Sequence, residues 1–210
     1  MKTLLTLVGI VAALLGCSSP KNSYYTLSAP EVPASTAMRH ATRIIVGPVT
    51  VPALVDNPQL VVKNSNNQVT VYEYQRWAGS LKSDIERVVA ADLARDLSTP
   101  NVWSYTQSLS TDFDYQVVMD VQNIDSKLGE SVTIDVLWRV KPKTTKAPAV
   151  DSADHKAARA SVSTRKQKQE VTGRSVVHER VHGEGFESLV AAQSRAFDQV
   201  SREIATAISP

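Results

Sequence analysis

The stretch YQVVMDVQ (residues 115–122), followed by VTIDVLWRV (residues 132–140), decides the fold that this sequence predicts. In both runs apolar residues alternate with polar ones, which is the pattern of a β-strand with one buried and one exposed face. A short turn that contains Gly129 joins the two runs, so they predict an antiparallel hairpin. The apolar face of this hairpin needs a second layer of structure to cover it.

Segments on both sides of the hairpin supply further strands and two helices that can form this layer. In each helical segment the apolar residues recur three and four positions apart, so that they line one face. The predicted fold class is α+β, with a mostly antiparallel mixed sheet covered by two amphipathic helices in a two-layer sandwich. The predicted strands are residues 42–51, 59–63, 68–74, 102–107 and 171–181, and the predicted helices are residues 80–97 and 186–208.

The N-terminus has the features of a lipoprotein signal peptide, predicted over residues 1–16. Lys2 precedes an apolar run of about twelve residues, whereas a helix that spans a bilayer needs about 20. The run ends in Gly16 and Cys17, preceded by two leucines, which resembles a lipobox. We therefore expect cleavage between Gly16 and Cys17 and lipidation of Cys17. The alternative is an ordinary secretory signal, but no Ala-x-Ala site follows the run and Cys17 is the only cysteine.

The mature chain is predicted to consist of a tether and one domain. Residues 17–41 begin with the lipidated cysteine and are rich in Ser, Pro, Ala and Thr, as linkers are, and residues 42–210 are long enough for one domain. Within the tether, the apolar segment YYTL (residues 24–27) is expected to dock on the domain. Ser18 after the cysteine resembles the sorting signal for the outer membrane, so we expect the periplasmic face of that membrane.

Charge is distributed unevenly along the chain. The net charge of +2 gives no reason to expect nucleic acid as a partner. Residues 141–170, however, hold eight basic and three acidic residues and almost no large apolar ones. We interpret them as a mobile basic insertion at a hairpin tip. It can be a solvated loop, or it can contact anionic lipid headgroups or an acidic partner.

One candidate catalytic motif occurs near the C-terminus. HERVH (residues 178–182) has the letters of the zinc-protease motif, in which two histidines on a helix bind zinc and the glutamate polarises water. Strand-like residues precede it, and Gly183 and Gly185 follow. In a strand Glu179 points away from the face that His178 and His182 share, so the sequence favours a chance match over a zinc hydrolase. We predict no catalytic residue, metal site or cofactor.

An aromatic-rich stretch precedes the first predicted helix. Tyr72, Tyr74, Arg76 and Trp77 are of the residue types that dominate the energetics of protein interfaces. They form a candidate partner contact. The alternative is that they only pack an edge strand onto the domain.

Taken in order, several segments resemble one family, the auxiliary lipoproteins of ABC-type intermembrane lipid transport, of the paraquat-inducible protein C (PqiC) type. Together with the lipobox, these segments cover nearly the whole mature chain in the family's order. Gly79, where the family often has an acidic residue, and the basic insertion depart from the pattern. The matching segments are YYTL (24–27), IVGPVTVP (45–52), VDNPQLV (55–61), RWAGSL (76–81) and the closing helix (189–208).

The resemblance implies a function without catalysis. Such lipoproteins work at the outer-membrane end of a path formed by mammalian-cell-entry (MCE) proteins, which are anchored in the inner membrane and form tunnels across the periplasm. Members of the family can assemble as homo-oligomeric rings, and the membrane itself is contacted through the N-terminal acyl chains. The alternative is a structural envelope lipoprotein that only stabilises another complex.

Overall fold

The computed structural model describes residues 20–29, 42–105, 112–143 and 169–209. Gly16, Cys17, most of the predicted tether and residues 144–168 of the predicted insertion lie outside these ranges. In chain order the elements are β1 (Ser23–Tyr25), β2 (Ile44–Thr50), β3 (Gln59–Ser65), β4 (Gln68–Trp77), α2 (Leu81–Asp96), β5 (Val102–Ser104), β6 (Tyr115–Lys127), β7 (Ser131–Pro142), β8 (Val171–Arg180) and α3 (Gly185–Ile208).

The larger sheet has five strands in the order β5-β2-β6-β7-β8. Its centre is the predicted hairpin of β6 and β7, which pair antiparallel from Tyr115 opposite Pro142 to Lys127 opposite Ser131. Gly129 in the turn has a φ of +72°, a conformation that glycine adopts without strain. β8 continues the sheet antiparallel to β7, whereas β2 is parallel to both of its neighbours.

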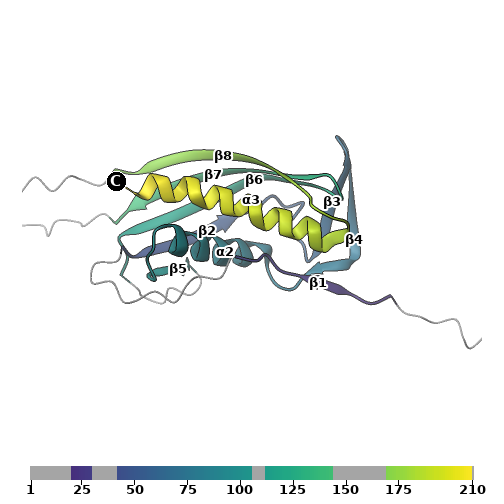
Figure 1. Ribbon diagram of the computed structural model, residues 1–210, viewed down its shortest axis with the longest axis horizontal. Helices are drawn as coiled ribbons and strands as arrows, with labels where there is room; N and C mark the ends of the chain where they lie inside the picture. The colour runs from purple at the N-terminus through teal and green to yellow at the C-terminus, as the bar shows by residue number, and fades with distance from the viewer. Residues whose placement is uncertain (1–19, 30–41, 106–111, 144–168, 210) are drawn as a thin grey trace, which may run out of the picture.

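Both helices cover the same face of this sheet (Figure 1), with α3 packed on β7 and β8 and α2 packed on β2 and β5. Their buried residues recur at helical spacing, for example Ile85 and Val89 on α2 and Phe197 and Ile204 on α3. Burying one such side chain fully stabilises the fold by about 1.5–3 kcal/mol. The predicted α+β class, a mixed sheet covered by two amphipathic helices, is confirmed.

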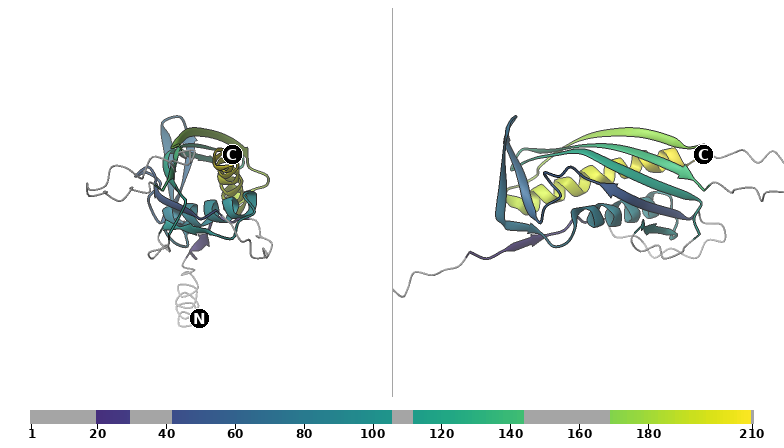
Figure 2. Two further views of the ribbon diagram at one scale, coloured as in Figure 1. Left: turned by 90° about the vertical axis from the view of Figure 1, so that its left-hand side faces the viewer. Right: turned by 180° about the vertical axis from the view of Figure 1, so that it is seen from behind.

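The sequence predicted a single sheet that includes the hairpin of β3 and β4. In the structure this hairpin does not continue the large sheet. With β1 it forms a separate sheet of order β1-β4-β3, which stands across one end of the long strands (Figure 2). Its inward side chains, Leu60, Val62 and Trp77, are 1%, 3% and 5% exposed. This small sheet closes the end of the core, which the large sheet and the helices alone would leave open to water.

The domain therefore has two different ends (Figure 1). The end with β1, the small sheet and the first residues of both helices is called the β1 end below. The other, called the opposite end, contains the C-terminus of α3, the last residues of β7 and the first of β8. There the backbone N–H of Lys143 donates to Asp114, and the N–H of Asp114 donates to Arg43.

Candidate functional site

The N-terminal segment is docked on the domain at the β1 end, as predicted for residues 24–27. β1 pairs parallel with β4, and the N–H of Ala78 donates to the carbonyl of Tyr25 at 2.8 Å. Asp84 on α2 accepts from the N–H of Leu27 at 3.3 Å, and the Arg87 guanidinium donates to the Leu27 carbonyl at 2.6 Å. Leu27 itself is 1% exposed. The segment thus belongs to the fold.

The two tyrosines of β1 have different environments. The hydroxyl of Tyr25 donates to Gln75 at 2.7 Å, and its ring lies 6.2 Å from that of Phe186. Tyr24, opposite Arg76 in the register, is 62% exposed. Because side chains alternate along a strand, docking Tyr25 leaves Tyr24 at the surface.

The four residues predicted as a partner contact are separated by the structure. Trp77 is buried in the core, and the Tyr72 ring packs edge-on against Phe186 with their centroids 4.7 Å apart. Tyr74 is 46% exposed, and Arg76 pairs with Glu73 at 3.1 Å near the surface. The register shifts between Tyr72 and Arg76, because β4 has extra residues there that have no counterpart on β3. Only Tyr74 and Arg76 are therefore placed to meet a partner.

Three exposed apolar residues of the same sheet were not predicted as contacts. Val69 and Val71 on β4 are 41% and 51% exposed, and Tyr24 is on the adjacent β1. With Tyr74 they form what we call the small-sheet patch. The signal was present in residues 68–74, where the valines alternate with Thr70 and Tyr72. Since Tyr72 faces the core, Val69 and Val71 must face outward on this side of the bulge.

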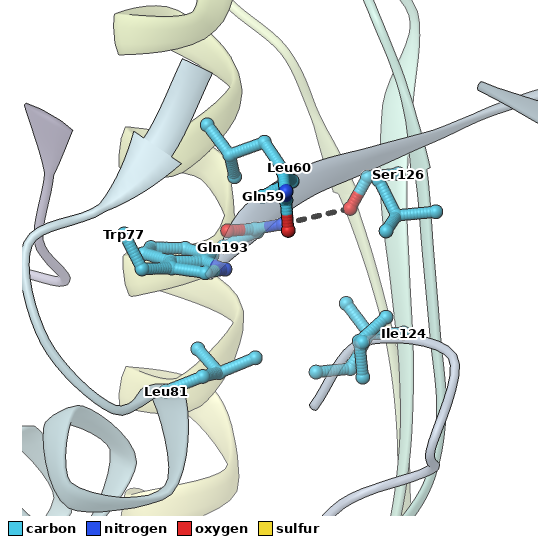
Figure 3. A pocket seen from close by; sticks show the side chains of 9 residues that line it. Gln59, Leu60, Trp77, Leu81, Ile124, Ser126 and Gln193 are labelled. Carbon is cyan, nitrogen blue, oxygen red and sulfur yellow. Dashed lines mark hydrogen bonds between the residues drawn. The ribbon is translucent and has the colours of Figure 1, made fainter. Parts of the chain in front are cut away.

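A small cavity lies where the two sheets and the helices meet (Figure 3). It is lined by apolar side chains, among them Leu60, Trp77 and Ile124, and by the polar pair Ser126 and Gln193. The Gln193 amide donates to the Ser126 hydroxyl at 2.8 Å, and its Oε1 has no partner among the described residues. The volume of about 10 Å³ is about what one water molecule needs, so an acyl chain does not fit.

A second depression is open to the surface beside Asp56, Pro58 and Ser80, with a volume of about 220 Å³. Ordinary small-molecule pockets measure about 300–1,000 Å³. In the described part of the chain, neither space can enclose a lipid.

An ionic cluster joins the two helices in the middle of the domain. Arg95 on α2 contacts Asp198 on α3 at 2.5 Å, and it also contacts Asp92 at 3.2 Å. Asp92 is 1% exposed, and burial raises the pKa of its carboxyl to about 6, with a further rise from the negative charge of Asp198. The Ser201 hydroxyl donates to Asp92 at 3.4 Å. Every partner is a side chain of one of the two helices, so we interpret the cluster as a helix–helix contact.

The HERVH segment does not form a metal site. His178 is on the outer face of β8, with its Nδ1 2.9 Å from the Thr133 hydroxyl. Glu179 faces α3 instead, where Arg195 and Gln199 donate to it at 3.3 and 2.5 Å. His182 follows the end of the strand. Within the described ranges, no group of three or more His, Cys, Asp or Glu residues could hold a metal ion.

These features define the class of protein: a two-layer α+β domain whose N-terminal segment is built into one end and whose described part has no metal cluster. No helix in the described ranges is long and apolar enough to cross a membrane. The chain belongs to the family of ABC-type transport auxiliary lipoprotein components, whose family model matches residues 25–205. A comparison with curated protein sequences found no significant match.

Solved structures show the same fold at low sequence identity. A crystal structure of an uncharacterized protein is 19% identical, with a TM-score of 0.64 over 90% of this chain and all of the other. A protein of Xanthomonas campestris from the DUF330 family is 16% identical, with a TM-score of 0.59 over 89% of this chain and 95% of the other. A PelC dodecamer from Paraburkholderia phytofirmans is 10% identical and has a TM-score of only 0.38 over 80% of this chain and 92% of the other.

Proposed function

We propose that this protein is a non-enzymatic lipoprotein of the outer membrane that acts in an MCE/ABC-type system for intermembrane transport of phospholipid or another hydrophobic compound. The observation that carries the proposal is the family match over residues 25–205, in a chain whose first residues resemble a lipoprotein signal. In this proposal acyl chains on Cys17 hold the protein at the periplasmic face of the membrane, and a periplasm-spanning MCE-domain protein is its partner.

The proposal needs the lipoprotein to work together with other subunits. The two spaces described above are too small to enclose a lipid, so neither of them provides a path through one copy. We propose that several copies surround a common axis as a homo-oligomeric ring, or that the domain docks on the tunnel protein. Of the four residues predicted as a partner contact, Arg76 is near the surface beside Glu73 and is placed to meet the partner, while Tyr72 and Trp77 hold the strand in place.

The proposal is tested by deleting the gene and restoring either the wild-type chain or the Cys17→Ser variant. We expect deletion to change the phospholipid balance between the two membranes and the permeability of the outer membrane, and only the wild-type chain to reverse both. Fractionation should place the wild-type protein in the outer membrane, and an MCE-domain protein should co-purify with it. Unchanged lipid balance and permeability would instead favour a structural envelope lipoprotein.

A further inference from the structure

The docking of β1 limits the distance between the domain and its anchor. Six peptide units connect Cys17 to Ser23, the first residue of β1. A fully extended chain spans at most about 3.3–3.6 Å per residue, so Cys17 lies within roughly 20 Å of β1. The predicted tether of residues 17–41 would allow several times this distance if all of it were free. The N–H groups of Leu27 and Ser28 donate to side chains of α2 and α3, and β1 pairs with β4, so this part of the tether is not free.

The short connection holds one particular end of the domain near the membrane. α3 has 24 residues, which corresponds to a length of about 36 Å at 1.5 Å per residue. The connection is shorter than this helix. Whatever the tilt of the domain, the β1 end remains within reach of the lipid surface.

The surface chemistry of the β1 end suits a lipid interface. Tyr24, Val69, Val71 and Tyr74 are four of the ten exposed large hydrophobic residues in the described ranges, and all four are on β1 or β4. Tyrosine is favoured at membrane interfaces, because its ring enters the apolar region while its hydroxyl remains hydrated. Lys21, four residues after Cys17, is exposed and can approach anionic headgroups.

We propose that the small-sheet patch rests in the headgroup region of the membrane that holds Cys17, and that this second contact orients the domain with its β1 end toward the lipid. The inference rests on the lipid anchor of the proposed function. A lipid surface requires no complementary shape, whereas a stable protein interface buries about 800 Å² on each partner. Four side chains, two of them valines, suit the first kind of contact better.

The test uses the full-length lipidated protein in vesicles of phosphatidylethanolamine and phosphatidylglycerol. Cys17 is the only cysteine, and in the proposed lipoprotein its sulfur is blocked by the diacylglyceryl group, so one introduced cysteine provides a single free thiol for an environment-sensitive dye. Val71→Cys places the dye in the patch, and Val171→Cys places it at the opposite end. Both valines are exposed on strands, at 51% and 37%, so neither change should disturb the core.

We expect blue-shifted emission at position 71 and quenching by headgroup-located quenchers at least threefold stronger than at position 171. Adding Tyr24→Ser and Tyr74→Ser should reduce the quenching at position 71 at least twofold. Equal quenching at both positions would overturn the proposal. The proposal would also be overturned if the dye at position 71 were shielded in native envelopes but exposed to water in pure lipid vesicles. That result would mean that a protein partner covers the patch.

The mass of the N-terminal peptide, measured on the same samples, separates this inference from the proposed function. Absence of quenching with an acylated Cys17 contradicts only the second membrane contact and leaves the anchor and transport proposals standing. An unacylated Cys17 contradicts the anchor, and the orientation proposal fails with it.

Discussion

The two ends of the domain differ in what they expose. The β1 end presents the small-sheet patch, next to a segment whose N–H groups donate hydrogen bonds to both helices. The opposite end presents an ionic cluster in which Arg43 pairs with Asp112 at 3.1 Å and with Asp114 at 3.3 Å, and Lys143 pairs with Asp112. In all three pairs the side chains are more than a third exposed.

The difference between the two ends affects how each end interacts with water more than it affects the stability of the fold. An exposed ion pair contributes only about 0–1 kcal/mol, because water and salt screen it. The cluster therefore makes the opposite end hydrophilic without holding the fold together. Exposed apolar side chains on neighbouring strands gain nothing from water, and such groupings mark interaction surfaces. The comparison predicts a β1 end that faces lipid and an opposite end that faces the aqueous compartment.

Cys17→Ser should have the largest effect, because in our proposal Cys17 carries the acyl chains that hold the β1 end at the membrane. Each buried CH₂ contributes about 0.8 kcal/mol to membrane binding, so the patch alone cannot replace them. We expect an unprocessed or soluble precursor, measured by membrane fractionation and by detergent phase partition. Wild-type amounts of the variant in the outer membrane would show that Cys17 is not the anchor.

Leu27→Ala should loosen the docked segment at the β1 end. Replacing a buried leucine by alanine costs about 2–5 kcal/mol, and Leu27 is 1% exposed. Denaturant unfolding of the full chain measures this loss. As the matched control, Leu54→Ala changes a leucine that is 49% exposed and should alter stability by less than about 0.5 kcal/mol. Equal stabilities of the two variants would mean that residues 23–28 are not part of the cooperative fold.

Asp92→Asn should abolish a pH dependence of stability that arises at the contact between the two helices. Because the pKa of Asp92 is raised to about 6, the folded protein binds its proton more tightly than the unfolded chain does. The free energy of unfolding should therefore fall as pH rises from about 4 to about 6, by at most roughly 3 kcal/mol, and then level off. Asparagine carries no titrating carboxyl, so the variant should lack this fall.

Asp112→Asn is the control for this pH dependence. The hydrogen bond from Lys143 lowers the pKa of Asp112, so its contribution has the opposite sign and is lost only as the solution becomes more acidic. Unfolding curves at several pH values should show the fall between pH 4 and 6 in this variant, as in wild type. If the fall disappears here and persists in Asp92→Asn, the assignment to the helix contact is wrong.

Deleting residues 144–168 and joining Lys143 to Gln169 by a short turn should have the smallest effect on stability, about 0.5 kcal/mol or less. The flanking strands β7 and β8 already pair, with Val140 opposite Val171. The flanks are at the opposite end, so quenching at position 71 should not change. Binding to the partner should become less sensitive to salt, because the deletion removes basic residues whose electrostatic attraction is screened by salt beyond a Debye length of about 8 Å. Equal affinity and equal salt dependence would identify the segment as a solvated loop.

Local patterns were sufficient to predict most of the elements. The alternation in residues 115–122 and 132–140 indicated β6 and β7, and helical spacing indicated α2 and α3. Each pattern repeats often enough within one element to distinguish the two-residue period of a strand from the 3.6-residue period of a helix. The partner contact was harder to predict. Tyr72 and Tyr74 are two residues apart, so plain alternation would place both on one face of β4. The register shift in β4 instead leaves Tyr72 packed against Phe186 and Tyr74 at the surface.

The sequence by itself determined the α+β class, the helical faces, the central hairpin and the resemblance that the family match confirmed, because all of these depend on residues close together in the chain or on the order of short motifs. Only the tertiary structure decided that the docked N-terminal segment forms a strand paired with β4, that the hairpin of β3 and β4 forms a second sheet, and that β2 lies between two parallel partners. A three-residue strand is too short to show a period. Its place is set by side chains more than fifty residues away, such as Asp84 and Arg87, which bind Leu27 only when the core is assembled.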